Sequence, residues 1–436
     1  MLSAKKFHLY EEVQRLHQQY GDFVRLGPSE LSVIHPGAVS AIHSPKSACS
    51  KGPWYNVLHP MVSLQTIRSK PEHVRRRKVW DPLRDYEPRV TKYTTQLLAR
   101  IEERKGKPMN VTEWFNFYSF DVMGDLAFGK SFGMLEQGVK HYFMISLHEF
   151  MKNIGLFSHM LWLLPIFKAT PILNSESNKF WQWVNAQVDE RKKMKPDRPD
   201  VFSWLLEDHE ARERPSAQEE LNLIGDAYTI AVAGRLVLTS YTDTTAGVLT
   251  CLFFQLAVEP RCLRALQEEV DTYFGTTETV EAVALSKLQY LDAVINETMR
   301  LHPPVPSGVQ RMTPPEGLRI GDTFIPGDAI VQIPYHTIFR DERNFEQPDD
   351  FIPERWTTRK ELVRNAAVFV PFSIGRYSCI GKQLGLMEIR YVVAQVVRRY
   401  NVELAPAQTL EAFLDSKKDT FTLALGPLDL VFTPRK

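Results

Sequence analysis

Cysteine is scarce in this chain, and its distribution excludes two common uses of the residue. Only four cysteines occur among 436 residues, namely Cys49, Cys251, Cys262 and Cys379. They are too few and too widely spaced for a disulfide framework, which indicates a reducing compartment. No CxxC pair occurs, and no second Cys or His close to Cys379 offers the ligand set of a zinc site. A cysteine that carries chemistry here must act alone.

Charge of one sign and long apolar runs are lacking as well. With 53 basic against 52 acidic residues the net charge is +1, so nothing indicates a nucleic-acid partner. No early segment has the roughly 18 apolar residues of a membrane span or the apolar core of a secretory signal. The most apolar run, "GLFSHMLWLLPIF" at 155–167, is short and contains a proline, which favours a hairpin or substrate-facing loop. We therefore expect no N-terminal membrane anchor.

The remaining pattern predicts a mainly α fold with small β-sheets. Apolar periodicity predicts helices over 85–105, 112–128, 176–192, 216–258, 260–274, 286–301 and 380–399. Strand signals lie in "DFVRLGPSELSVIHP", in 317–337 with Pro326-Gly327 as the turn, and in a C-terminal hairpin "DTFTLALGPLDLVFTPR". The composition does not change across "KKMKPDRPD", which predicts a surface loop there. We predict one large domain over residues 1–436.

Cys379 lies in the segment "PFSIGRYSCIGKQLG". A lone cysteine is usually a small buried hydrophobe. Here Gly375 and Gly381 would let the backbone turn tightly and approach a bulky group, and Phe372 offers an aromatic face. A helix starting at Ile380 would place its positive end beside the sulfur, lower the thiol pKa and favour a thiolate. A single thiolate suits a metal whose other ligands come from a haem.

This spacing, FxxGxxxCxG before a helix, resembles the haem-binding loop of the cytochrome P450 monooxygenases. Three further stretches follow the family's order: "TDTTAG", "NETMRLHPPVP" and "FIPERW". The resemblance extends over essentially the whole chain and is strongest to fungal members that tailor secondary metabolites. It implies a P450-like domain that encloses haem b with Cys379 as the axial ligand to iron.

The resemblance also implies roles for other residues. Glu297, Arg300 and Arg355 would form a buried charge network that fixes the cysteine loop. In "EHVRRRKVW", His73 and Arg77 would contact the haem propionates, together with Arg311. The remaining haem contacts would come from the loop itself, from Phe372, Gly375, Tyr377 and Gly381.

The basic helix around His73 permits another interpretation. A solvated charged face is the ordinary alternative, and it is expected for Arg75, Arg76 and Lys78. Those charges could also dock an acidic flavoprotein that delivers electrons.

Asp243 and Thr244 are the candidate distal proton relay, in which a hydroxyl and an acid, with water, deliver protons. The alternative is a threonine that donates to the carbonyl four residues earlier, which is common in helices.

Three departures from the family pattern bear on activity. Leu236–Thr242 looks like an insertion between "AGR" and "DTTAG", and it would slide the distal helix by about 10 Å. Tyr377 stands where the family usually has arginine, so a phenol replaces a cation. Compared with the family pattern, the segment "VWDPLRDYEP" is shorter than usual, and the family's apolar N-terminal anchor is not found in the sequence.

Three functions follow from these observations. The first is a monooxygenase that takes electrons from NADPH through cytochrome P450 reductase, with cytochrome b5 as a second candidate donor, and hydroxylates, epoxidises or cyclises an apolar small molecule. The second is an isomerase or dehydratase of the same fold that needs no reductase. The third is an inactive haem-loaded binding protein. We expect a monomer, on the cytosolic face of the endoplasmic reticulum by resemblance but cytoplasmic or peripheral without an anchor. Residues 51–65, 155–167 and 303–308 are expected to line the substrate pocket.

Overall fold

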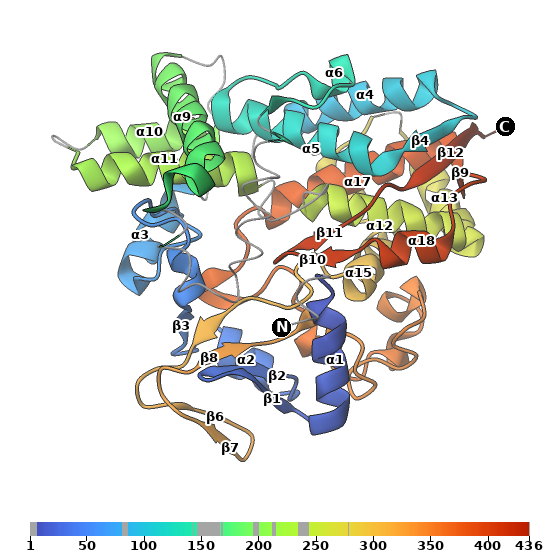
Figure 1. The fold of residues 1–436 in the computed structure, drawn as a ribbon. Coiled ribbons are helices and arrows are strands. Elements are labelled where there is room, and N and C mark those ends of the chain that lie inside the picture. The colour runs from blue at the N-terminus through green and yellow to red at the C-terminus, as the bar shows by residue number, and fades with distance from the viewer. Residues whose placement is uncertain are drawn as a thin grey trace.

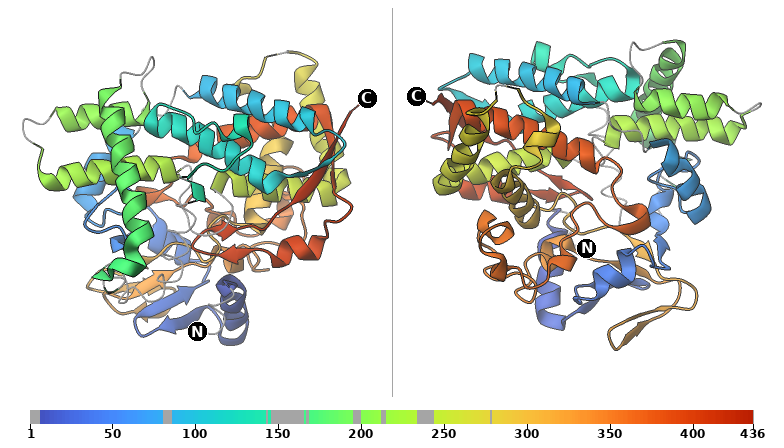
Figure 2. Two further views of the ribbon diagram at one scale, coloured as in Figure 1. Left: turned by 45° about the horizontal axis from the view of Figure 1, so that its top comes forward. Right: turned by 180° about the vertical axis from the view of Figure 1, so that it is seen from behind.

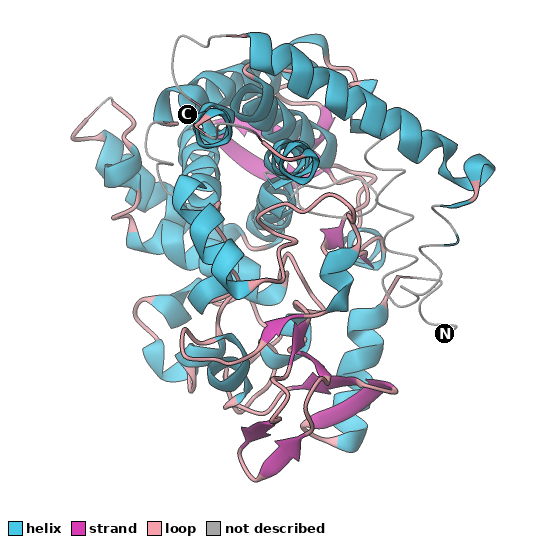
Figure 3. Ribbon diagram, turned by 90° about the vertical axis from the view of Figure 1, so that its left-hand side faces the viewer, coloured by secondary structure: helices cyan, strands magenta, loops and turns pink. Residues whose placement is uncertain are grey.

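The architecture comes from a computed structural model of the chain, which describes residues 7–80, 86–142, 144–145, 166, 169–194, 200–211, 215–233, 244–277 and 279–435. Helices form most of it, and most of the strands lie toward one end (Figures 1 and 3). The predicted class, mainly α with small β-sheets, is confirmed.

Two buried helices form the centre of the helical part. Helices α5 (Val111–Phe128) and α12 (Thr244–Val258) pack on each other, and nearly every residue of both is buried. Apolar residues on all sides are expected of a helix enclosed by others. The surrounding long helices are α4 (Glu87–Glu103), α9 (Pro171–Lys193), α11 (Ala217–Ala233), α13 (Pro260–Phe274), α15 (Gln289–Leu301) and α17 (Lys382–Arg399).

Shorter helices complete the described part of the chain. They are α1 (Leu9–Tyr20), α2 (Ala38–His43), α3 (Lys70–Trp80), α6 (Met134–Gln137), α10 (Val201–Glu210), α14 (Ala282–Leu285), α16 (Tyr335–Ile338) and α18 (Leu410–Asp415), with 3-10 turns η2 (Pro53–Asn56), η4 (Pro353–Trp356), η5 (Lys360–Leu362), η6 (Ala366–Val368) and η7 (Gly375–Tyr377). Helices α9, α10 and α11 pack together and form one side of the molecule in both views of Figure 2.

The largest sheet has the strand order β1-β2-β8-β5-β3. Its strands are β1 (Phe23–Gly27), β2 (Glu30–Val33), β8 (Ile330–Gln332), β5 (Arg311–Met312) and β3 (Ser50–Lys51). A second sheet has the order β4-β12-β9, from β4 (Pro108–Asn110), β12 (Asp429–Pro434) and β9 (Tyr400–Leu404). The large sheet packs on α2 and α16 in a smaller apolar core, and the helices enclose the main one.

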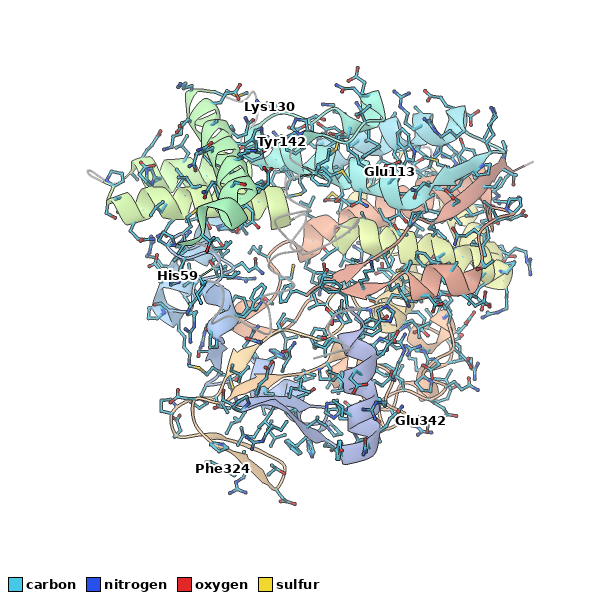
Figure 4. The ribbon with its side chains drawn as sticks, viewed as in Figure 1. His59, Glu113, Lys130, Tyr142, Phe324 and Glu342 are labelled. Carbon is cyan, nitrogen blue, oxygen red and sulfur yellow. The ribbon has the colours of Figure 1, made fainter. Side chains whose placement is uncertain are left out.

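A turn does follow Pro326, at Gly327 and Asp328, but it is not the turn that closes the strand pair. Strands β6 (Leu318–Ile320) and β7 (Thr323–Ile325) pair with each other and turn at Gly321, whose φ of 55° suits glycine. Gly327 instead follows the hairpin, and a Cβ atom there would lie 2.1 Å from the carbonyl oxygen of Pro315. The hairpin carries the exposed Phe324 away from the body of the molecule (Figure 4).

The C-terminal hairpin is wrong as predicted, because its two halves join different sheets. β11 (Leu423–Ala424) pairs with β10 (Lys418–Asp419), whereas β12 pairs with β4 and β9. The predicted strand pair at the N-terminus is confirmed as β1 and β2.

Most predicted helices are present, with shifted ends. The single helix predicted over 216–258 is described as α11 and α12, and residues 234–243 between them lie outside the described residues. The helix after the cysteine begins at Lys382 rather than Ile380. The apolar run 155–167, the interior of the predicted loop 192–200 and the short segment 81–85 also lie largely or wholly outside the described residues.

Among the described residues, no single helix is both long and apolar enough to cross a membrane. Helices α12 and α13 pass such a test only together, as a pair bent by 109°.

Candidate active site

The Cys379 loop lies between the smaller apolar core and the start of α17. The backbone N–H of Cys379 donates to the carbonyl of Phe372 at 2.8 Å, which closes the loop on itself. Of the four cysteines only Cys379 is exposed, because its side chain opens onto an internal cavity. Phe372, Ile380 and Gly381 line the same cavity beside it. The structure therefore presents one sulfur atom to one enclosed space.

The two predicted glycines differ in what they do. Gly375 has φ of 71°, and a Cβ atom there would lie 2.5 Å from the carbonyl oxygen of His43, so it permits close packing on the end of α2 and does not line the cavity. Gly381 lines the cavity, and a Cβ atom there would meet nothing within 4 Å. Only Gly381 therefore leaves space for a bound group next to the sulfur.

The predicted lowering of the Cys379 pKa is wrong. Burial raises the pKa of the thiol above its ordinary value, and this outweighs the backbone N–H groups of Gly381 and Lys382 and the Arg77 guanidinium, which lower it. The helix begins three residues after the sulfur, so its N–H groups compensate only partly. A thiol in this position is deprotonated by a metal that binds it.

Three cations and one histidine, from three elements, line the same side of the cavity, which we call the cationic wall. They are His73 and Arg77 from α3, Arg311 from β5 and Lys51 from β3. Arg77 donates to the carbonyl of Ser378 at 2.8 Å, which ties α3 to the cysteine loop. Arg311 donates to the phenol of Tyr55 at 3.1 Å. No Asp or Glu is among the described residues that line this cavity.

Several buried polar atoms that line the cavity have no hydrogen-bond partner among the described residues, and two of them lie close to these cations. These two are Nδ1 of His73 and the hydroxyl of Tyr377, whose rings meet edge to face with centroids 4.9 Å apart. Burial lowers the pKa of His73 to about 3, and the charges of Lys51 and Arg77 add to this effect. His73 is therefore neutral in this structure and offers a hydrogen bond rather than a charge.

Much of the remaining lining is apolar and comes from helices and loops far apart in the sequence; we call it the apolar wall. Its members include Trp80, Val248, Met299, Val305, Val309, Ile389 and Phe421. Thr244, the first residue of α12, also lines the cavity, whereas its predicted partner Asp243 lies outside the described residues. The proton relay therefore stays a prediction. Of the regions expected to line a substrate pocket, 51–65 and 303–308 do contribute residues to this cavity.

The predicted charge network is present and fully buried. Glu297 accepts from Arg300 at 2.8 Å and from Arg355 at 2.9 Å, and all three side chains have 0% exposure. The indole N–H of Trp356 donates to the same carboxylate at 2.9 Å, and so does the backbone N–H of Ile352. Other N–H groups of the two guanidinium side chains donate to backbone carbonyls of residues 339–350. The network thus joins α15 to the segment that precedes the cysteine loop.

One member of the predicted solvated face is buried instead. Arg76 is 6% exposed and forms an ion pair with Asp226 of α11, which also accepts the backbone N–H of Leu64. Every third or fourth residue of α3 faces the protein, so Arg76 shares the inner face with His73 and Trp80. Arg75 and Lys78 are exposed as expected.

Comparison with known proteins decides the family. The family model described as "Cytochrome P450" matches residues 1–432. The chain belongs to the cytochrome P450 family. It is 54% identical over 437 residues to "Cytochrome P450 monooxygenase FCK2" of Fusarium pseudograminearum, covering 99% of this chain and 78% of that protein. It is 45% identical to "Cytochrome P450 monooxygenase orf5" of Eupenicillium brefeldianum, covering 100% of this chain and 88% of that protein. It is 38% identical to "Tryprostatin B 6-hydroxylase" of Aspergillus fumigatus, covering 97% and 76%.

These findings confirm the prediction of a cytochrome P450 monooxygenase of fungal secondary metabolism. P450 membership implies a haem-thiolate cofactor, a redox partner and a small-molecule substrate. The residues of the cavity fit such a group. A haem has a metal centre, an apolar plane and two carboxylates, and the cavity offers one sulfur, an apolar wall, a cationic wall without carboxylates and unpartnered polar atoms.

The roles of two contributors to this site were not predicted from the sequence, although Lys51 begins the 51–65 region that was expected to line the substrate pocket. Lys51 lies in a short strand whose letters "SKGPW" carry no periodic signal, and only the pairing of β3 with β5 brings it to the cavity. Trp356 belongs to the segment "FIPERW", but the sequence predicted no role for it. In the structure it donates the fourth side-chain hydrogen bond to Glu297.

Proposed function

We propose that this P450 uses NADPH, through cytochrome P450 reductase, to activate O2 and either insert one oxygen atom into an apolar small molecule, by hydroxylation or epoxidation, or close a ring by oxidative cyclisation, in which case both oxygen atoms leave as water. The cavity carries this proposal, because a single sulfur, an apolar wall and a cationic wall converge on it. When bound, a thiolate-ligated haem supplies the oxidising chemistry, since the thiolate donates electron density that favours O–O cleavage.

Each residue of the site would have the following role. Cys379 would hold the iron, and Phe372 and Gly381 would shape the space around the sulfur. His73, Arg77, Arg311 and Tyr377 would bind the two carboxylates of the haem. Asp243 and Thr244 would deliver protons from the distal side. Glu297, Arg300 and Arg355 would keep the cysteine loop in place without touching the haem, in one domain over residues 1–436.

The substrate is proposed to be an apolar polycyclic or aromatic molecule. Phe421 lines the cavity and stacks on Trp54, with centroids 4.2 Å apart and planes 10° apart. A flat apolar guest can extend such a pair, because offset ring stacking is favourable. The name of the relative from Aspergillus fumigatus includes a hydroxylase activity, and hydroxylation is the reaction we place first.

Oxygen-isotope labelling tests this reaction type. The holoprotein is incubated with reductase, NADPH, 18O2 and a panel of apolar aromatic compounds, and products are analysed by mass spectrometry. A product that gains one 18O atom only when NADPH is present supports the monooxygenase. Conversion without NADPH or O2 would contradict it and favour the isomerase. Cys379→Ser serves as the inactive control.

The partner and the location are proposed from the family. An acidic flavoprotein reductase would dock on an exposed basic face, for which Arg75 and Lys78 are candidates. We place the enzyme at the cytosolic face of the endoplasmic reticulum or free in the cytoplasm, as a monomer. Fractionation of expressing cells distinguishes the two locations.

A further inference from the structure

Lys51 is one of two almost fully buried cations in the wall of the cavity, the other being Arg311, which is 2% exposed. Lys51 itself is 3% exposed, and its ammonium donates to the carbonyl oxygens of Leu64, at 3.1 Å, and Gln65. The ammonium also lies 5.0 Å from the ring centroid of Tyr377 and 5.2 Å from that of Tyr55. The two carbonyl groups and the two tyrosine rings are neutral, so none of them balances the positive charge of Lys51.

The sheet places this charge directly against a second one. Lys51 of β3 is the register partner of Arg311 of β5 in an antiparallel pair. Like charges directly opposite each other on a sheet destabilise it. The Arg311 guanidinium lies 5.1 Å from the same Tyr377 ring, so both cations surround one phenol. In the described chain no carboxylate lies within ion-pair distance of Lys51, Arg77 or Arg311.

Placing these buried cations next to each other destabilises the folded protein unless an anion balances their charge. A buried, unpaired ammonium loses several kcal/mol of hydration. Burial and the nearby Arg311, Arg77 and Arg76 guanidinium groups accordingly lower the pKa of Lys51 well below its ordinary value. The Tyr377 hydroxyl and the His73 Nδ1 atom lie in the same wall, and neither has a hydrogen-bond partner among the described residues. The wall therefore lacks hydrogen-bond partners as well as a balancing negative charge.

We propose that Lys51 binds a haem carboxylate together with the phenol of Tyr377, and so supplies from strand β3 the positive charge that the cysteine loop itself lacks at residue 377. This inference rests on the proposed haem in the cavity. It assigns Lys51 a cofactor-binding role, beyond fixing the 57–67 segment through the Leu64 and Gln65 carbonyls.

The rate of haem loss tests this role without any measurement of turnover. Haem transfer from the purified holoprotein to an excess of apomyoglobin is followed in the visible spectrum. Loss of a buried charge-assisted contact worth about 1.4 kcal/mol or more gives at least a tenfold faster transfer in Lys51→Met. Lys70→Met is the matched control, because it removes the same charge from a lysine that donates to the Ala48 carbonyl at an exposed position, and it should leave the rate unchanged.

Two further arms separate charge binding from a structural role. In Lys51→Met/Tyr377→Arg, a guanidinium enters the same space, and the rate should return to within about threefold of wild type. Reconstitution with haem dimethyl ester, which has no carboxylates, should make wild type and Lys51→Met equal. If Lys51→Met fails to fold, Tyr377→Arg alone still tests the proposal, because added charge should slow haem loss.

The outcomes are distinguishable. Equal rates for Lys51→Met and Lys70→Met, or a Lys51 effect that persists with the dimethyl ester, would overturn the role of Lys51 and leave the haem-thiolate function intact. A wild-type protein that binds no haem would overturn both.

Discussion

Glu297 is a fully buried acceptor on which several donors converge. Its two carboxylate oxygens accept from Arg300, Arg355, Trp356 and the backbone of Ile352, all in the fully buried interior. Removing its charge would leave two buried guanidinium groups without their only carboxylate. We therefore expect Glu297→Gln to lose about 3–5 kcal/mol of unfolding free energy and to be isolated largely without haem.

Urea unfolding and the ratio of haem to protein measure both effects. Glu361→Gln is the control, because Glu361 forms an exposed pair with Arg359, and such pairs contribute about 0–1 kcal/mol. A Glu297→Gln protein that keeps full haem and wild-type stability would show that the network is dispensable.

Asp419 predicts a pH dependence of stability. Burial raises its pKa to about 6, although the Ser307 hydroxyl and the Phe421 N–H donate to its carboxylate. In the unfolded chain the pKa is about 3.9. The folded state therefore holds this proton more tightly, so the contribution of Asp419 is fully present below about pH 4 and is lost as pH rises through 6.

Asp419→Asn keeps the size of the side chain and does not titrate. Relative to this variant, wild type should lose up to about 3 kcal/mol of unfolding free energy between pH 4 and pH 7, which corresponds to the pKa shift. Urea unfolding of both proteins at the two pH values gives the difference. A constant difference across this range would contradict the raised pKa.

At the scale of single residues, the sequence predicted which residues form the site better than it predicted which of them are buried. The family spacing located Cys379 and the Glu297 network, because a fixed motif carries them. Arg76 and Lys51 were not recognised as buried, since a charged residue is usually exposed and only tertiary contacts with Asp226 and β5 bring these two inside. The thiol pKa was misjudged for the same reason, because burial cannot be read from the segment alone.

At the scale of elements, one buried ion pair joins the end of α9 to the start of α10. Asp200 accepts from Arg191 at 2.7 Å, with side chains 0% and 1% exposed, and it also caps α10 through the N–H of Ser203. Asp200→Ala would remove a cap worth about 0.5–2 kcal/mol and leave Arg191 buried and unpaired, which costs about 3–5 kcal/mol. We expect a loss of at least about 3 kcal/mol.

Chemical denaturation measures this loss, and Glu190→Gln provides the comparison. Glu190 is one residue before Arg191, but it forms an exposed pair with Lys130, so its loss should cost less than about 1 kcal/mol. Equal stabilities of the two variants would show that the Arg191–Asp200 pair does not hold α9 and α10 together.

Helices were predicted more reliably than strand pairing. The apolar period of α5, α13 and α15 lies in consecutive residues, so their bounds differ from prediction by only a few positions. Pairing of β12 with β4 and β9 joins residues more than 300 positions apart in one case, and no local pattern specifies it. The sequence located the turn after Pro326 but not the hairpin turn at Gly321, because the turn that closes a strand pair depends on which strands pair.

At the scale of the whole molecule, the described chain has two apolar cores that share partners. The main core lies among the helices and the smaller one beside the β1-β2-β8 sheet, and Phe369 packs against both. Glu297 of α15 also contacts residues next to the smaller core. We expect the holoprotein to unfold in one cooperative transition, with coincident melting curves from far-UV circular dichroism, tryptophan fluorescence and haem absorbance. Two separate transitions would indicate two independent domains.

The assignment of Cys379, which lines the cavity, as the ligand of a haem iron is the claim on which the function depends. The carbon monoxide difference spectrum of the dithionite-reduced protein tests it most directly, with Cys379→Ser measured beside wild type. We predict a strongly red-shifted thiolate band in wild type that is absent from the variant. A band typical of a neutral thiol or imidazole ligand, or a band that survives in Cys379→Ser, would contradict Cys379 as the axial ligand.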